Sequence, residues 1–399
     1  MSPTVAARRG RPVPFSSRPS IAERLGIPYM DPFLLIAGLA LALFSIFTLT
    51  DATLNDVPGD PYYFVERQSI YVALGVVGMF ALTQIDYSRF RELRVGIYTL
   101  MFVSIGMVFV FGAAARGSRR AFELPFINFQ PAELGKVLLI LALAGFVIDG
   151  ARRGSPGQRT ARYLLLGLAP AALVFLQPDL GTSLVFGAVT LAVIFLAGIR
   201  WSHFLAIAAG FVVMVTAVLV VAPAVGTPVL KGYQEQRLTS FLHPSEDPAD
   251  AGYQQNQAKI AIGSGEKTGR GEKATQTRLD FVPERHTDFI FAVIGERFGF
   301  LGAAFVLSLF ALLIWRALRI VTLSKNLYGT LVAGGITAML MFQVFVNVGM
   351  NLGIMPITGI PLPLMSYGGS SVLATFLALG ILQSIHMQAQ LSQKSRDYF

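Results

Sequence analysis

The stretch FVPERHTDFIFAVIGERFGF, residues Phe281–Phe300, joins a polar loop to a long apolar segment. From Phe289 to Trp315 the chain is almost wholly apolar, and it is longer than the roughly 20 residues that a helix needs to cross about 30 Å of hydrocarbon. We therefore predict a membrane-spanning helix with Asp288 in its first turn, where the helix dipole favours an anion.

Small side chains follow Asp288 at helical spacing, which would let a second helix approach closely. They are Ala292, Gly295, Gly299, Gly302 and Ala303. This stripe predicts that Asp288 faces protein or a water-filled cleft rather than lipid. The alternative, that Asp288 is only an interfacial helix cap, stays open at this point.

The composition of the whole chain indicates a membrane protein. Its 399 residues are 54% hydrophobic and 14% charged, and the mean hydropathy is +0.60; a soluble domain of this size is less apolar and carries more charge. The chain has no cysteine, which excludes a disulfide framework and a cysteine-ligated metal site. The four histidines, His203, His243, His286 and His386, fall on three different predicted spans or loops and on two sides of the membrane, so we do not expect them to form one metal site.

Ten apolar segments are each predicted to form a membrane-spanning helix, because open strands cannot cross lipid. They are residues 33–50, 66–85, 95–112, 131–149, 161–176, 181–198, 203–222, 288–316, 327–350 and 367–386. The predicted fold is therefore all-α and polytopic, and an even number of spans puts both termini on one side of the membrane.

The distribution of positive charge predicts which side that is. More than half of the 32 Lys and Arg residues fall on the side of the termini, whereas the short loops of the other side hold Arg67, Arg116, Arg119 and Arg120. Cytoplasmic loops are enriched in Lys and Arg, so both termini are predicted to be cytoplasmic. This topology accounts for much of the net charge of +9 without a nucleic acid partner.

The spans define one membrane domain, residues 31–390, between two tails. Residues 1–30 are rich in Arg, Pro and Ser and are predicted to form a disordered cytoplasmic tail, and residues 391–399 form a second cytoplasmic tail. The one long loop, residues 223–287 between the seventh and eighth spans, is predicted to be extracytoplasmic. A short helix at the membrane interface is predicted near residues 253–262.

A second candidate site lies where Arg119 and Arg120 precede the fourth span, which carries Glu133 and Lys136. Glu133 and Lys136 are three residues apart and share one helical face. Lys136 lies about 8 Å inside the predicted helix, where an unpaired lysine would cost about 2.5–3.5 kcal/mol. Two compatible interpretations follow: a structural ion pair with Glu133, or a cationic pocket for a phosphate on the outer leaflet. The outer arginines favour the second.

Three more outer residues are candidates, each with a simpler alternative. Arg67, at the mouth of the second span, could meet an anion or only snorkel to the interface. Asp179, in the hairpin between the fifth and sixth spans, could share a cleft with Asp288 or only form a turn. His286 could tune Asp288 or be a solvated loop residue.

The last outer loop, Met350–Ser371, has no charged residue, and its prolines and glycines break the helix at membrane depth. Such a break is tolerated only where protein or water satisfies the backbone. Gly368 and Gly369, at the start of the tenth span, could offer N–H groups to an anion. An ordinary tight turn is the alternative.

Five motifs, in this order on ten predicted spans, resemble the SEDS family (shape, elongation, division and sporulation) over about residues 31–390. The motifs are QPAELGK at 130–136, QPDLGT at 177–182, AIGSG at 261–265, PERHTDFIFAVIGE at 283–296 and PLPLMSYGGSS at 361–371. The resemblance is nearer to the RodA group than to the FtsW group, because FtsW-like chains usually carry a lysine where this chain has Thr358. SEDS proteins usually have apolar residues after the GSG segment, whereas this chain has Glu266–Thr268 and Glu272–Lys273. This difference concerns how the long loop packs or meets a partner.

The resemblance implies a peptidoglycan glycosyltransferase in the plasma (inner) membrane that polymerises lipid II on its outer face during cell elongation and shape maintenance. It implies undecaprenyl diphosphate as the product and a class B penicillin-binding protein, the cross-linking transpeptidase, as a partner. Other elongation-complex proteins and membrane lipids are further expected partners. Asp288 matches the essential carboxylate of the family, and Lys136, Arg67 and Asp179 also match functional positions.

The chemistry of that implied reaction assigns roles to these residues. Replacement of an α-linked diphosphate by a sugar hydroxyl to give a β-link is an inversion, which needs one base and cationic help for the leaving group. We expect Asp288 to be the base, and a divalent ion, Mg or Mn, stays open as a cofactor. The expected substrate-binding residues are Lys136, Arg67, Asp179, Glu133, Arg119, Arg120, Ser366, Gly368 and Gly369. The alternative functions are a flippase or transporter of the lipid-linked precursor and a non-catalytic scaffold of a cell-wall synthesis complex.

Overall fold

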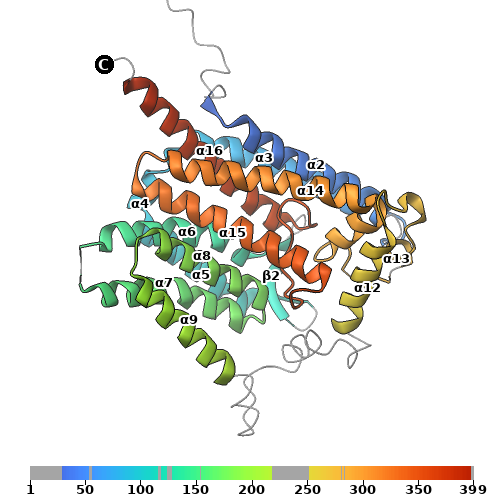
Figure 1. Cartoon of the computed structure of the whole chain (residues 1–399), viewed down its shortest axis with the longest axis horizontal. Coiled ribbons are helices and arrows are strands. Elements are labelled where there is room, and N and C mark those ends of the chain that lie inside the picture. Colours follow the sequence, from blue (N-terminus) through green and yellow to red (C-terminus); the bar gives the residue numbers. More distant parts are fainter. Residues whose placement is uncertain are drawn as a thin grey trace, which may run out of the picture.

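The computed structural model describes residues 29–53, 56–115, 118–123, 128–152, 154–217, 251–279, 281–282 and 284–396. Long helices dominate this part of the chain and lie side by side along the longest axis of the molecule (Figure 1). The long helices are α2 (Pro32–Ala52), α3 (Tyr63–Thr83), α5 (Arg94–Phe111), α6 (Pro131–Gly150), α7 (Pro156–Leu176), α8 (Leu180–Leu196), α9 (Trp201–Thr216), α14 (Ile290–Leu323), α15 (Leu327–Leu352) and α16 (Gly369–Arg396). Each predicted span overlaps one of them.

Eight of the described helices are long and apolar enough to cross a membrane, namely α2, α3, α5, α6, α7, α14, α15 and α16. The apolar helix α8 has 17 residues and α9 has 16, which is at or below the short end of the lengths that span hydrocarbon. The chain is therefore an α-helical polytopic membrane protein. Helices α6, α15 and α16 are the most buried of the eight, so they form the centre of the bundle.

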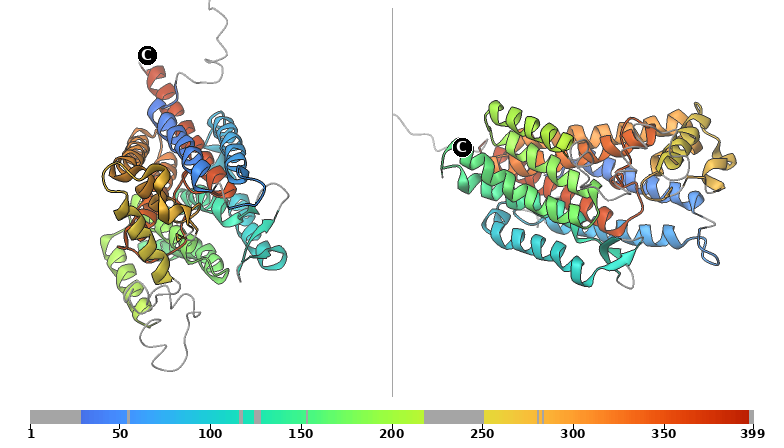
Figure 2. Two further views of the ribbon diagram at one scale, coloured as in Figure 1. Left: turned by 90° about the vertical axis from the view of Figure 1, so that its right-hand side faces the viewer. Right: turned by 90° about the horizontal axis from the view of Figure 1, so that it is seen from below.

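Short elements gather at one end of the bundle. Helices α12 (Ala251–Ser264) and α13 (Thr275–Arg278) and the 3-10 turn η3 (Gly271–Lys273) lie there, at the right-hand end of the bundle in Figure 1 and in the right-hand view of Figure 2. The short helix α4 (Arg89–Glu92) and the C-terminal end of α16 lie at the opposite end (Figure 1). We call these the α12 end and the α4 end. The predicted helix at 253–262 is part of α12, which packs on α14 and α15.

A small sheet was not expected from the sequence. Strands β1 (Ala113–Ala115), β2 (Ser118–Glu123) and β3 (Asn128–Phe129) pair antiparallel in the order β1-β2-β3, just before α6. The membrane part is all-α, but the connection from α5 to α6 is not. Residues 223–250 of the predicted long loop, the tail 1–28, His243 and Arg116 lie outside the described residues.

The segment around Asp288 differs from the prediction in two ways. Helix α14 has Phe289 as its N-cap, so Asp288 precedes the helix and does not lie in its first turn. The helix also breaks at Gly299, which has φ 63° and ψ −159°, a conformation that favours glycine.

The break at Gly299 is compensated by the turn that follows α12. The N–H of Phe300 donates to the Glu266 carbonyl at 2.9 Å, and that of Leu301 donates to the Lys267 carbonyl at 3.1 Å, so the backbone groups freed by the break are satisfied. A Cβ on Gly299 would lie 2.4 Å from the N of Gly269. The predicted close approach at the small-residue stripe is thus present at Gly299. The segment that approaches it is the turn that follows α12.

Candidate active site

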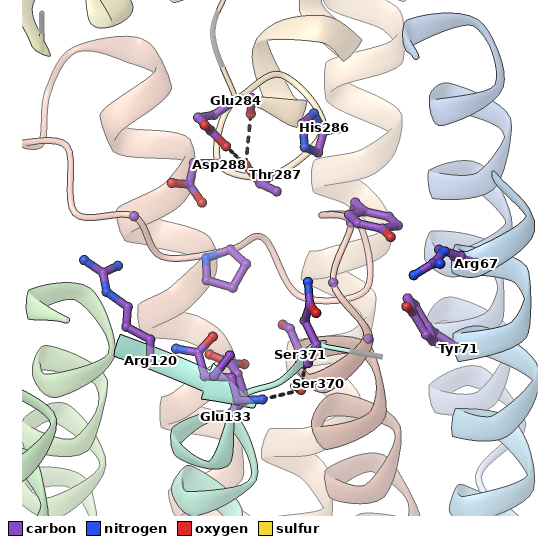
Figure 3. A pocket seen from close by; sticks show the side chains of 18 of the residues that line it. Arg67, Tyr71, Arg120, Glu133, Glu284, His286, Thr287, Asp288, Ser370 and Ser371 are labelled. Atoms are coloured by element: carbon purple, nitrogen blue, oxygen red, sulfur yellow. Dashed lines mark hydrogen bonds between the residues drawn. The ribbon is translucent and has the colours of Figure 1, made fainter. Parts of the chain in front are cut away.

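A polar cavity of about 510 Å³ lies at the α12 end of the bundle. Its walls come from α3, β2, the starts of α6, α8 and α16, the turn before α14 and the loop between α15 and α16 (Figure 3). Of the predicted site residues, those that line it are Asp288, Arg67, Asp179, Glu133, Arg120, Gly368 and Gly369. Lys136 and Ser366 do not line it. The prediction that Asp179 and Asp288 share a cleft is therefore confirmed.

Asp288 is half-buried, and Figure 3 shows its carboxylate in the cavity. Its backbone carbonyl accepts hydrogen bonds from Asn347 Nδ2 at 2.9 Å and Asn351 Nδ2 at 3.1 Å. Asn351 Oδ1 also accepts the N–H of Ala292 at 3.1 Å. Two amides on α15 therefore fix the backbone from which the Asp288 carboxylate projects.

The turn that precedes Asp288 is held from the other side by the loop before α16. Ser366 Oγ donates to the carbonyl of Thr287 at 2.6 Å and accepts the N–H of Leu362 at 2.8 Å. The N–H of Tyr367 donates to the carbonyl of His286 at 2.8 Å. Ser366 therefore braces the site instead of facing the cavity.

A second carboxylate, Glu284, lies in the same turn and lines the cavity. Thr287 Oγ1 donates to Glu284 Oε2 at 3.1 Å (Figure 3). The backbone of Glu284 has φ 55°, a region that non-glycine residues rarely adopt and that is enriched at functional sites. Glu284 was not predicted as a site residue, although it stands four residues before Asp288 in one of the five motifs.

Glu133 and Lys136 form the predicted ion pair. Lys136 Nζ lies 2.8 Å from Glu133 Oε1, and the two side chains are only 2% and 4% exposed. Glu133 lines the cavity and Lys136 does not. Each charge compensates the other in a site where either alone would be very unfavourable.

Asp179 is the N-cap of α8 and is 6% exposed. Its Oδ1 accepts the N–H of Thr182 at 3.0 Å, and its Oδ2 accepts from Thr182 Oγ1 at 3.0 Å and from Gln130 Nε2 at 2.8 Å. Both predicted alternatives, the turn and the shared cleft, hold for this residue. Its contacts tie the start of α8 to the start of α6.

Two arginines bring positive charge to the cavity. Arg67, on α3, stacks its guanidinium 4.3 Å from the centre of the Tyr63 ring. Arg120, on β2, donates from Nη2 to the carbonyl of Pro178 at 2.5 Å, and its buried Nε has no hydrogen-bond partner among the described residues. Arg119 pairs with Ala114 through the backbone of the sheet, and its side chain lies outside the described part.

The N-terminus of α16 also faces the cavity, through Gly368, Gly369, Ser370 and Ser371. Ser370 Oγ accepts the N–H of Gln130 at 2.8 Å and donates to the Asn128 carbonyl at 3.0 Å, so it fastens the strand before α6 to α16. The free N–H groups at the start of a long helix and its dipole favour an anion. The N–H of Gly368 already donates to Gln68 Oε1 at 3.4 Å, and the anion-binding role of the two glycines stays a prediction.

Aromatic rings close one side of the cavity. The His286 ring lies 4.7 Å from the ring of Phe64 and 5.9 Å from that of Tyr367, and its Nδ1 is 3.9 Å from Asp56 Oδ2. His286 is thus a packed wall residue. Burial raises the pKa of the Tyr367 hydroxyl, and the neighbouring Tyr71 raises it further, so Tyr367 stays neutral at physiological pH.

Within the described residues there is no group of three or more His, Cys, Asp or Glu residues that could hold a metal ion. A divalent cation at this cavity would need oxygen ligands from a phosphorylated substrate, as Mg²⁺ commonly has.

The chain is similar to known proteins along most of its length. A profile of the cell cycle protein family FtsW/RodA/SpoVE matches residues 30–391. Peptidoglycan glycosyltransferase MrdB of Escherichia coli K12 is 37% identical over 370 residues, which cover 92% of this chain and 96% of MrdB. Probable peptidoglycan glycosyltransferase FtsW of Idiomarina loihiensis is 34% identical over 377 residues, with 92% and 90% covered.

Two solved structures share the fold. A chain from a structure described as the structural coordination of polymerization and crosslinking by a peptidoglycan synthase complex aligns with a TM-score of 0.76 and 32% identity, covering 90% of this chain and 98% of that one. The rod shape determining protein RodA of Thermus thermophilus aligns with a TM-score of 0.64 and 30% identity, covering 90% and 96%. The predicted resemblance is confirmed: the chain belongs to the FtsW/RodA/SpoVE family of cell cycle proteins, the SEDS family.

Proposed function

We propose that this chain is a peptidoglycan glycosyltransferase that polymerises lipid II at the cavity of the α12 end. The observation that carries the proposal is that one carboxylate, Asp288, shares a cavity with Arg67, Arg120 and the N-terminus of α16. A base and anion-binding groups are the two parts that an inverting transfer from a diphosphate donor requires. The activities named for the E. coli and I. loihiensis relatives support it.

The proposed orientation of the protein in the membrane follows from the distribution of its basic residues. All ten long helices cross the membrane in this proposal, with both termini in the cytoplasm. Among the short connections, basic residues are concentrated at the α4 end, for example Arg89, Arg91, Arg152 and Arg200, as expected for a cytoplasmic side. The cavity of the α12 end then opens on the outer side of the plasma membrane, where lipid II is used.

In the proposed mechanism Asp288 removes the proton from the attacking sugar hydroxyl. The hydroxyl oxygen forms a bond to the anomeric carbon as the bond from that carbon to the diphosphate oxygen breaks, and the electron pair leaves with the diphosphate. Arg67, Arg120 and the N–H groups at the start of α16 stabilise the charge that develops there. Undecaprenyl diphosphate is the product that leaves.

The buried contacts supply rigidity for this step. Asn347 and Asn351 hold Asp288 from α15, and Asp179 and Ser370 hold Gln130 at the rim. We assign the Glu133–Lys136 pair the task of holding the Glu133 side chain in place at the cavity. A catalytic constellation must be held within a fraction of an ångström by its surroundings.

A lipid flippase is the competing function, because a helical bundle with a polar cavity also describes carriers. The polar residues that line the first cavity lie at one end of the bundle and not at its middle, which favours the transferase. A scaffold role would leave Asp288 dispensable. The class B penicillin-binding protein stays our proposed partner, supported by the synthase complex whose chain shares this fold, and a role in cell shape is supported by the Thermus relative.

The decisive experiment is polymerisation of lipid II by the purified full chain in detergent, where no bilayer exists to be crossed. The unchanged protein and Asp60→Asn, a variant of a carboxylate that does not line the cavity, should form glycan polymer. Asp288→Ala should melt at the same temperature and form none. Equal polymer from Asp288→Ala would refute the assignment, and no polymer from any protein would favour the flippase.

A further inference from the structure

A second cavity, of about 210 Å³, lies between the ends of α6, α7, α8 and α9, on the α4 side of the bundle and away from the candidate active site. Its polar lining consists of Arg159, Thr160 and Tyr163 from α7, together with Arg200 and His203 at the start of α9. Nothing in the proposed glycosyl transfer uses these residues.

The polar lining of this second cavity is fixed by hydrogen bonds. Thr160 Oγ1 lies 2.7 Å from His203 Nδ1, which joins α7 to α9. The Tyr163 hydroxyl donates to the carbonyl of Val147 at 3.2 Å. The Tyr163 hydroxyl fits at this position because residue 150 is a glycine. A Cβ at residue 150 would lie 2.7 Å from the Tyr163 oxygen. The cavity is therefore built by specific side chains and is not a gap between loosely packed helices.

The charge of the second cavity is positive and locally uncompensated. None of the described residues that line it is acidic. The acidic residue of α6 at this end, Asp149, already pairs with Arg91 at 2.6 Å and Arg94 at 2.9 Å. Arg159 and Arg200 form no ion pair within the described residues, and Arg159 uses one nitrogen for the Ala151 carbonyl. Two guanidinium groups are thus available to an anion.

An aromatic cluster next to the second cavity indicates how deep in the membrane this cavity lies. Trp201, Phe195 and Phe204 lie with ring centres 5.7 to 6.0 Å apart, and Trp201 is 71% exposed. Exposed tryptophan at the end of an apolar helix is typical of the lipid headgroup region. Arg200 directly precedes this tryptophan, so the cavity lies where lipid phosphates are found.

We propose that the second cavity binds the phosphate of an anionic phospholipid of the cytoplasmic leaflet. Arginine recognises phosphate through two parallel hydrogen bonds, and basic pockets between membrane helices on the cytoplasmic side suit anionic headgroups. The volume is below that of pockets for drug-sized ligands, about 300–1,000 Å³, which fits a phosphate headgroup. A bound lipid would join α7 to α9 and stabilise that corner. The proposal rests on the orientation proposed above and is independent of glycosyl transfer.

The test counts lipids retained by the full-length protein with native mass spectrometry, in detergent supplemented with phosphatidylglycerol or phosphatidylcholine. We expect one saturable phosphatidylglycerol and much weaker binding of phosphatidylcholine. Replacing each arginine should weaken phosphatidylglycerol binding about fivefold, so Arg159→Gln with Arg200→Gln should lose most of it. Arg200→Gln alone provides a milder variant if the double variant is unstable.

The matched control is Arg319→Gln, which removes an exposed arginine that does not line the cavity. It should bind phosphatidylglycerol like the unchanged protein. Equal binding by the double variant, or an equal loss in Arg319→Gln, would overturn the proposal. If inorganic phosphate in excess displaces the lipid and stabilises the protein to the same extent, the ligand is a soluble phosphate, and the assignment to lipid is wrong. Polymerisation of lipid II should be measured on the same double variant. A normal rate would show that the proposed glycosyl transfer does not depend on the second cavity, whatever the lipid measurement gives.

Discussion

The two cavities described above both carry arginines, but among the residues that the structure describes only one of them also carries acids. At the α12 end, Asp288, Glu284, Glu133 and Asp179 line one cavity together with Arg67 and Arg120. At the other end, Arg159 and Arg200 line a smaller cavity without any described acidic residue. A site with both signs of charge can move a proton and bind a leaving anion, whereas a site with cations alone can only hold an anion.

The two cavities also differ in how they are braced. Two amides of α15 hold the backbone carbonyl of Asp288, and Glu133 is paired with Lys136 of its own helix, α6. At the second cavity, Arg200 is exposed to solvent. Its side chain and a phospholipid headgroup can therefore adjust to each other. A cavity lined by several braced carboxylates is suited to chemistry, whereas a cavity with an exposed arginine is suited to binding. Substitutions should therefore affect the two cavities differently.

The largest effect is expected from Lys136→Met, which would leave Glu133 buried without its partner. Removing one member of a buried ion pair costs about 3–5 kcal/mol, so the thermal midpoint of the purified protein should fall strongly. Lys325→Met, at the α4 end and not part of an ion pair among the described residues, should change it little. Equal midpoints for Lys136→Met and the unchanged protein would show that the buried pair does not stabilise the cavity.

The next effect separates the two cavities by function. Arg120→Gln removes a cation from the polar cavity and should lower the polymerisation rate by about 10²–10³-fold, the usual loss when one group that stabilises developing negative charge is removed. Arg200→Gln removes the same charge from the second cavity and should leave the rate in detergent unchanged. The measurement is the initial rate of polymer formation from lipid II. A comparable loss in both variants would show that the two cavities are not functionally separate.

A smaller effect is expected from Asn351→Ala, which removes one of two amides that hold the Asp288 carbonyl. The turnover number should fall about tenfold while KM for lipid II stays near its normal value, because positioning and not binding is lost. Gln343→Ala, a buried amide on the same helix that does not contact the turn, is the control. Loss through KM alone, or an equal loss in Gln343→Ala, would argue against a positioning role.

Much of the fold could be predicted because hydropathy is a local property of the sequence. Each of the ten predicted spans overlaps a helix, although only eight of the described helices are long and apolar enough to cross a membrane. The Glu133–Lys136 pair followed from a spacing of three residues on one helical face. The shared cleft of Asp179 and Asp288 was also predicted, because both carboxylates stand at the same end of their spans.

The features that were not predicted depend on contacts between distant segments. The break at Gly299 is possible because the carbonyls of Glu266 and Lys267 accept the freed N–H groups, and the sequence of α14 does not contain that information. Asn351 and Ser366 brace the Asp288 turn from other elements, and Glu284 reaches the cavity only through a turn with positive φ. The placement of Asp288 before α14 also depends on this turn, which is why the expected first-turn position was wrong.

In the proposed mechanism Asp288 acts in the chemical step while the cations of the same cavity bind the diphosphate. Lipid II binding and polymer formation should be measured on one preparation of Asp288→Asn, a variant that keeps the shape of the side chain but cannot accept the proton as a carboxylate does. We expect binding equal to that of the unchanged protein and a loss of polymerisation of about 10²–10⁴-fold, the range for a general base. Polymerisation at a near-normal rate, or loss of binding and turnover together, would contradict this mechanism.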